Sequence, residues 1–120
     1  MTESNWQIPP QGGHMDLPTG IYLQNMTWKQ IAARLEKNDL IIIPIGSTEA
    51  HGPHACIGED TFLVTRMAEA VAARTGCTVA QPIWYGSHPY HHMGMPGTII
   101  VPEEIFIGQI KAVIAGLWNM

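Results

Sequence analysis

The chain has 120 residues, of which 46% are apolar and only 13% are charged, and its formal net charge is −4. That length allows one domain with a real core, and the acidic balance gives no electrostatic basis for binding nucleic acid or an anionic membrane. No apolar run reaches the roughly 18–20 residues of a membrane span, and the first residues lack the basic and apolar regions of a signal peptide.

The N-terminal part of the chain is irregular and is followed by a short helix. Residues 1–26 are rich in proline and glycine without a sustained period, which predicts a leader that wraps the domain or is partly disordered. The domain itself is expected over residues 27–120. Thr27 with Gln30 three residues later is the pattern of a capping box and predicts a helix through about Lys37. The inward face of that helix would consist of Trp28, Ile31, Ala32 and Leu35.

A buried strand and a second helix come next. Leu40 to Ile45 is a continuous apolar, β-branched run, which is typical of a parallel strand covered on both faces. The second helix is predicted from about Thr61 to Arg74, with Gly76 just past its end. The residues that follow its 3.6 period are Leu63, Met67, Ala70, Val71 and Arg74.

The remaining elements predict a mostly parallel sheet. Thr78 to Ile83 reads as a second strand, Trp84 to Gly97 as a long loop, and Thr98 to Val101 as a short strand. Pro102 fits the first position of a third helix. Its buried stripe would be Phe106, Ile110, Val113, Ile114 and Leu117.

The order of these elements predicts an α/β fold of βαβ units, with a sheet layered between helices. A crossover helix normally leads to another parallel strand, so we expect the fold to be truncated at Met120. The charged fraction is well below the roughly 25% of an average globular chain. We therefore expect a partner, either further copies of the chain or a complementing C-terminal chain, to cover part of the surface.

Two cysteines, Cys56 and Cys77, lie in unlike contexts, which favours reduced thiols over a disulfide. We expect both thiols to be buried and inert. Together with the absence of a signal-like segment, this predicts a cytoplasmic protein.

The loop after the first strand carries a possible metal site. Glu49 and His51 are two residues apart at the carboxyl end of a strand, so both side chains point to the same side. Asp60 starts the second helix near the same edge, where open α/β sheets place their ligands. Carboxylates with a neutral imidazole suit Zn²⁺ or Mn²⁺, and a carboxylate such as Asp60 can bridge two ions.

Simpler structural roles remain open for each of these residues. Asp60 alone is a good N-cap, His51 alone a hydrogen-bonded loop histidine, and Glu49 alone a surface charge. His54 is either part of the loop structure or a further group of the site. Ser47 lacks the flanking residues of a nucleophile elbow, so a serine hydrolase is weakly supported.

The second loop holds three histidines and two tyrosines, including Tyr85, His91 and His92, among glycines and prolines. It leaves the same sheet edge, so these side chains can line a polar substrate pocket beside the metals. The alternative is that the histidines hydrogen-bond the backbone of their own loop.

Both loops resemble one protein family. The segment Gly-Ser-Thr-Glu49-Ala-His51-Gly-Pro-His54, then Gly-Glu-Asp60-Thr, is similar to the signature of the creatininase family of metal-dependent hydrolases. The segment His92-Met-Gly-Met-Pro-Gly-Thr98 resembles the family's second loop. The resemblance covers about residues 38–118 and stops before the family's next strand, which supplies another histidine and a carboxylate. The long leader and histidine-rich loop look less like creatininase itself and more like the branch of 3-dehydro-scyllo-inosose hydrolases.

The resemblance implies two divalent ions, with Asp60 bridging them, Glu49 on one and His51 on the other. It implies that His92 contacts the substrate or a reacting proton. The pocket interpretation of the two loops adds His54, Tyr85 and His91 as candidate substrate-binding residues. The second loop is one residue longer than the common pattern, so the resemblance gives no role to Ser87 or His88.

Two functions are compatible with these residues. The first is hydrolysis of a small cyclic substrate, a cyclic ketone or cyclic amide, by a water that bridges the two ions. The second is a non-catalytic piece that needs a partner chain to complete its metal site, because two metal ions need more ligands than the residues of this loop provide.

Overall fold

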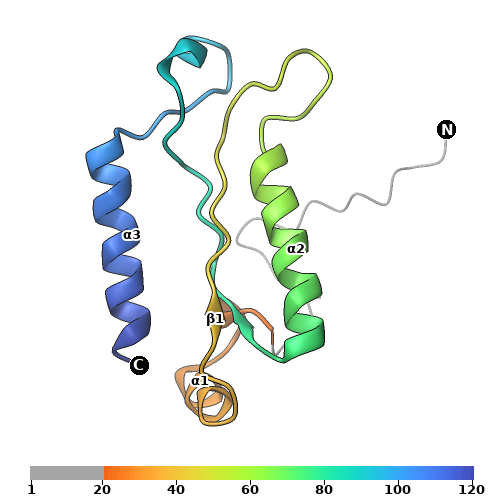
Figure 1. Ribbon diagram of the computed structural model, residues 1–120, viewed down its shortest axis with the longest axis vertical. Helices are drawn as coiled ribbons and strands as arrows, with labels where there is room; N and C mark the ends of the chain where they lie inside the picture. Colours follow the sequence, from red (N-terminus) through yellow and green to blue (C-terminus); the bar gives the residue numbers. More distant parts are fainter. Residues whose placement is uncertain (1–20) are drawn as a thin grey trace, which may run out of the picture.

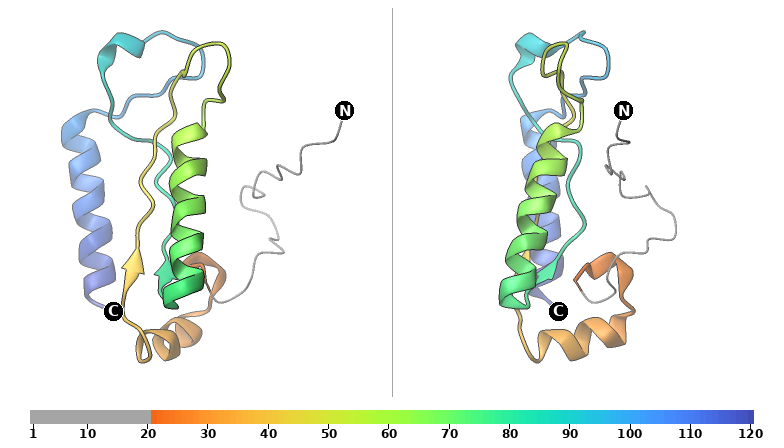
Figure 2. Two further views of the ribbon diagram at one scale, coloured as in Figure 1. Left: turned by 45° about the vertical axis from the view of Figure 1, so that its right-hand side comes forward. Right: turned by 90° about the vertical axis from the view of Figure 1, so that its right-hand side faces the viewer.

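The computed structural model describes residues 21–120 as an α/β arrangement. In Figures 1 and 2 the central extended segments run between α2 and α3, with α1 at one end and the two long loops at the other. The predicted α/β class with parallel strands is confirmed. The elements in chain order are η1 (Leu23–Asn25), α1 (Trp28–Leu35), β1 (Ile41–Ile42), α2 (Glu59–Thr75), β2 (Thr78–Val79), η2 (Tyr90–His92) and α3 (Glu103–Trp118).

The regular strands are shorter than predicted. β1 pairs in parallel with β2 through Ile41 with Thr78 and Ile42 with Val79, and pairing resumes only at an isolated bridge between residues 45 and 83. Pro44 and Pro82 lie between these two points and have no N–H to donate, which interrupts the ladder on both strands. The expectation that both faces of the first strand are covered is also wrong, because Leu40 is 65% and Ile45 41% exposed.

The capping box at the start of α1 is confirmed. Thr27 Oγ1 accepts a hydrogen bond from the backbone N–H of Gln30, and Gln30 Oε1 accepts one from the backbone N–H of Thr27. The helix ends at Leu35, two residues earlier than predicted. Its predicted inward face is only partly correct, because Trp28 and Ala32 are exposed. α1 is instead tied to the rest of the chain by Arg34, whose guanidinium donates to Thr78 Oγ1 and to two backbone carbonyls before β2.

α2 covers β2 with a different face from the predicted one. Its buried residues are Thr61, Ala68 and Ala72, which are small enough for the helix to lie close to the strand. The predicted stripe is on the outside, with Leu63 52% and Met67 61% exposed. The predicted C-terminus is confirmed to within one residue, because Gly76 takes a left-handed conformation (φ 73°) that ends the helix. The other members of the predicted stripe, Ala70, Val71 and Arg74, are also exposed.

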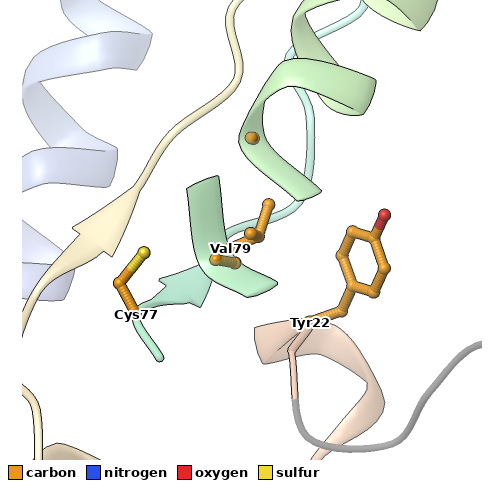
Figure 3. Close-up of a cluster of buried hydrophobic side chains, with 5 residues drawn as sticks. Tyr22, Cys77 and Val79 are labelled. Carbon is orange, nitrogen blue, oxygen red and sulfur yellow. The ribbon is translucent and has the colours of Figure 1, made fainter. Parts of the chain in front are cut away.

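The buried core is small and lies where α2 meets β2. It consists of Tyr22, Ala68, Ala72, Cys77 and Val79, of which Figure 3 labels the tyrosine, the cysteine and the valine. Tyr22 forms a parallel bridge with Val79, and its hydroxyl donates to Glu69 of α2. Burial and the hydrogen bond to Glu69 raise the pKa of Tyr22 above its ordinary value.

Tyr22 belongs to the predicted leader, which the structure describes only from residue 21 onward. Residues 21–26 contribute this core tyrosine and the short helix η1. The rest of the predicted leader, residues 1–20, lies outside the described residues.

α3 is present as predicted but none of its residues is buried. Pro102 is its N-cap rather than its first residue. Within the predicted stripe, Phe106 and Leu117 are half-buried whereas Ile114 is 48% exposed, so the expectation of a fully buried face is wrong for residues 21–120. Among the described residues, no helix is both long and apolar enough to cross a membrane.

Both cysteines are free, as predicted. Cys77 is buried in the core, but Cys56 is exposed, so the expectation that it is buried is wrong. Cys56 lies in the loop that precedes α2, beyond the part of the chain that the small core encloses.

Candidate metal centre

Two loops meet at the end of the molecule opposite α1 (Figures 1 and 2). One follows β1 and leads into α2, and the other follows β2 and leads into α3. Backbone and side-chain hydrogen bonds join them, from the Ile99 amide to the Thr48 carbonyl at 2.9 Å and from the Ala50 amide to Thr98 Oγ1 at 2.9 Å. Because of these contacts, residues that are about 40 positions apart in the chain face one another.

A close approach between the first loop and α2 sets the position of the site residues. A Cβ atom on Gly46 would lie 2.1 Å from Thr61 Oγ1 and 2.6 Å from Thr61 Cα, so only glycine fits there. Thr61 is fully buried and its hydroxyl donates to the Ser47 carbonyl at 3.4 Å. This contact holds the start of α2, and therefore Asp60, next to the residues that follow β1.

The first cluster consists of Glu49, His51 and Asp60, which each offer one ligand atom within 4.8 Å of the others. His51 Nε2 lies 3.1 Å from Asp60 Oδ2. Ser47, which the sequence did not single out for this role, donates a 2.6 Å hydrogen bond to the same Asp60 oxygen. The sequence placed Glu49, His51 and Asp60 at one edge, and the structure brings them together; their role as ligands stays a prediction.

Asp60 is not the N-cap of α2, so this alternative role is wrong. The N-cap is Gly58, and Asp60 lies within the first turn of the helix. Burial raises the pKa of Asp60, but the hydrogen bond from Ser47 and the neighbouring His51 outweigh it, so that its pKa is lowered overall. The amino end of the helix favours the negative form as well. Asp60 is therefore held as a carboxylate, the form that binds a cation.

A second cluster shares Glu49 with the first and consists of Glu49, His88 and His92. His92 Nδ1 lies 3.2 Å and His88 Nδ1 3.0 Å from Glu49 Oε2. The sequence pointed to His92 but gave no role to His88. No local pattern identifies His88, because it lies in a loop whose position is set by hydrogen bonds to the first loop.

The donor set fits a divalent ion of the Zn²⁺ or Mn²⁺ kind. The two clusters together combine carboxylate oxygens with imidazole nitrogens, which these ions accept. Both clusters lie in the segments that follow β1 and β2 in the chain, on the side of the sheet where a ligand of an open parallel sheet is expected.

The three predicted substrate-binding residues are all exposed. His54 and Tyr85 are exposed, with Tyr85 54% accessible to solvent. His91 is also exposed, and its ring meets the His92 ring edge-on with centroids 4.1 Å apart. Only His91 therefore has a described contact with a cluster residue, and the role of all three stays a prediction.

A family model described as creatinine amidohydrolase matches residues 24–120, which is most of the chain and includes both clusters. This chain belongs to the creatininase family. The match contains the two loops on which the sequence resemblance was based, so the predicted family is confirmed.

Two curated members of the creatininase family show how far the similarity extends. A 3-dehydro-scyllo-inosose hydrolase from Thermotoga maritima is 69% identical over 105 residues, which cover 88% of this chain and 34% of that protein. A creatinine amidohydrolase from Pseudomonas putida is 29% identical over 102 residues, covering 81% of this chain and 39% of that protein. The chain thus spans little more than a third of the length of these relatives.

Solved structures of creatininases share the fold. A creatinine amidohydrolase (creatininase) crystal structure has a TM-score of 0.77 at 27% identity and covers 84% of this chain and 41% of its own. A structure described as creatininase Mn has a TM-score of 0.77 at 28% identity, covering 83% of this chain and 41% of its own. A mutant described as Zn-Zn type has a TM-score of 0.76 at 28% identity, covering 82% of this chain and 40% of its own. The creatininase-like fold predicted from the sequence is confirmed.

Proposed function

We propose that the protein to which this chain belongs is a divalent-metal-dependent hydrolase that opens a small, polar, cyclic substrate. The observation that carries this proposal is the convergence of Glu49, His51 and Asp60, whose ligand atoms lie within 4.8 Å of one another. The creatininase structures described as Mn and Zn-Zn types support Mn²⁺ and Zn²⁺ as the native ions.

The residues of this chain would divide the work between binding and proton transfer. Asp60, Glu49 and His51 would hold the divalent ions. When bound, such ions lower the pKa of a water molecule and polarise the carbonyl that this water attacks. His92 faces the Glu49 carboxylate at 3.2 Å and is partly open to solvent, a position from which it can move a proton to or from the substrate.

The substrate class follows from the relatives. The Thermotoga maritima relative, 69% identical, is named a 3-dehydro-scyllo-inosose hydrolase, and this supports a cyclic polyol ketone over a cyclic amide. Exposed polar side chains beside the site, including His54, Tyr85 and His91, suit a ring with many hydroxyl groups. A cytoplasmic location and a role in inositol breakdown are consistent with such a substrate and belong to the same proposal.

The proposal is tested by incubating the purified protein with 3-dehydro-scyllo-inosose and, separately, with creatinine, and following uptake of one water by mass spectrometry. We expect ring opening of the ketone only. Opening of creatinine instead would place the substrate in the cyclic amide class. Turnover of neither, by a protein that has bound metal, would contradict the proposed reaction.

Variants test the residue roles. Glu49→Gln and Asp60→Asn should lose both metal and turnover, whereas His92→Ala should keep the metal and lower turnover by about 10²–10⁴-fold. Glu104→Gln, an exposed carboxylate in the first turn of α3, is the matched control and should change neither. Retained turnover in Asp60→Asn would contradict the mechanism.

A second candidate function is a non-catalytic piece that needs a partner chain to complete its metal site. It is favoured by exposed apolar side chains on two helices, with Met67 61% and Ile105 58% exposed. Further copies or a complementing chain would cover these faces and add metal ligands. A native mass spectrum decides: two ions per chain, or a bound second polypeptide, supports a completed site, whereas a bare monomer supports a non-catalytic role.

A further inference from the structure

His88 is the most deeply buried histidine of the second loop. Its side chain is 6% exposed, whereas that of His92 is 28% exposed. Its Nε2 atom lies 3.2 Å from the carbonyl oxygen of Ile99. A carbonyl oxygen only accepts hydrogen bonds, so Nε2 carries the proton and the neutral ring has its lone pair on Nδ1.

The Nδ1 atom of His88 faces the carboxylate of Glu49. It lies 3.0 Å from Glu49 Oε2, yet it is buried and has no hydrogen-bond partner among the described residues. In the neutral ring a lone pair therefore meets a carboxylate oxygen, and two acceptors at that distance repel each other. A protonated ring would remove the repulsion, but an N–H on Nδ1 finds no aligned acceptor there.

A divalent cation between the two atoms resolves both problems. Two atoms that bind one ion through bonds of about 2.1 Å lie roughly 3.0 to 3.4 Å apart, which agrees with the 3.0 Å between Nδ1 and Oε2. A histidine that binds metal through one nitrogen usually donates its other N–H to a carbonyl or carboxylate, as His88 does to Ile99.

We propose that His88 is a further metal ligand, binding through Nδ1 the ion that Glu49 holds. This inference rests on the proposed function, because it adds a ligand to the same metal centre. It gives that ion one nitrogen from the second loop and so makes the second loop part of the metal site, in addition to the first loop and α2.

The test compares metal affinity in two variants. In His88→Gln the side-chain amide can still donate to the Ile99 carbonyl, but no nitrogen replaces Nδ1 beside Glu49. Ser87→Ala, a neighbouring exposed position in the same loop, is the matched control. Zn²⁺ affinity, measured by competition with a chromophoric chelator, should fall in His88→Gln by at least the roughly 10–100-fold that loss of an outer-shell partner costs, and stay unchanged in Ser87→Ala.

The outcomes separate this inference from the proposed function. Unchanged Zn²⁺ affinity in folded His88→Gln overturns the ligand role and leaves the hydrolase proposal intact. A wild-type protein that binds no divalent ion overturns both. Should His88→Gln fail to fold, long-range ¹H–¹⁵N spectra of the wild-type imidazoles decide, because Zn²⁺ must shift the His88 Nδ1 resonance while Nε2 stays protonated. An unshifted Nδ1 resonance overturns the inference.

Discussion

The hydroxyl of Ser47 donates a 2.6 Å hydrogen bond to Oδ2 of Asp60. The same hydroxyl lies 3.3 Å from Oε1 of Glu49, so one buried side chain contacts both carboxylates of the first cluster. Ser47 follows directly after Gly46, whose contact with Thr61 fixes the distance between the loop and α2. The serine therefore orients the carboxylates and need not act as a nucleophile.

Ser47→Ala should weaken divalent-metal binding by about 10–100-fold, the usual cost of removing a hydrogen bond that orients a metal ligand. The substitution removes one hydroxyl and should leave the fold in place. Metal affinity by chelator competition, with a circular dichroism spectrum of each variant, is the measurement. Zn²⁺ binding at wild-type strength by Ser47→Ala would show that the hydroxyl does not hold the carboxylates in a productive position.

Gly46→Ala should lower the free energy of unfolding by about 1–3 kcal/mol or prevent folding, because overpacking a closed contact costs that much. The added methyl would meet the Thr61 backbone at 2.6 Å, which side-chain rotation cannot relieve. Gly108→Ala is the control. Nothing lies within 4 Å of a Cβ at residue 108 in α3, so alanine there should raise stability by up to about 1 kcal/mol. Urea unfolding of both variants decides, and equal effects at the two positions would contradict the close approach.

Arg34→Met should destabilise the protein by about 1–3 kcal/mol, since it removes hydrogen bonds from a charged donor to partly buried oxygens. The Arg34 guanidinium contacts Thr78 Oγ1 at 2.7 Å and the carbonyls of Gly76 and Cys77 at 2.9 Å each. These bonds are the described link between α1 and the start of β2. Lys37→Met removes an exposed charge close by and should stay within about 0.5 kcal/mol of wild type. Matching losses in the two variants would mean that the link contributes little.

Local features of the fold could be predicted because each depends on a few adjacent residues. The capping box at Thr27 and the left-handed Gly76 follow from side-chain and backbone preferences over one turn. The break in both strands was also visible, as Pro44 and Pro82, but a continuous apolar run outweighed it in the prediction. The faces of α2 could not be predicted, because an apolar stripe and a stripe of small residues both fit a helix, and only the close approach of β2 selects Ala68 and Ala72.

The candidate site also combines features that could be predicted from the sequence with one that could not. Strand geometry predicted that Glu49 and His51 share a side, and the structure brings them together although both lie in the loop beyond β1; Asp60 reaches them because α2 begins at the same edge. His88 could not be placed, because its position depends on the hydrogen bonds that join the two loops, such as that between Ile99 and Thr48. Contacts of this kind are made between residues far apart in the chain and have no local pattern.

The raised pKa of Tyr22 predicts how the free energy of unfolding changes at high pH. Burial and the hydrogen bond to Glu69 raise its pKa in the folded protein above the value of about 10 expected when it is unfolded. Below pH 10 the phenol is protonated in both states, and its contribution to stability is fully present. Above pH 10 the unfolded chain releases the proton first, so stability falls, by up to about 1.4 kcal/mol per pH unit, until the folded phenol also ionises.

Tyr22→Phe separates this effect from other alkaline titrations. At pH 7 it should be less stable than wild type by about 0.5–1.5 kcal/mol through loss of one hydrogen bond, while Glu69 keeps its 2.8 Å contact with Arg66. Between pH 9 and 11 its stability should fall less steeply, so that the two thermal unfolding midpoints converge. Tyr90→Phe, at a position 59% exposed, should keep the wild-type slope. Parallel curves for wild type and Tyr22→Phe would show that the buried phenol does not drive the alkaline loss.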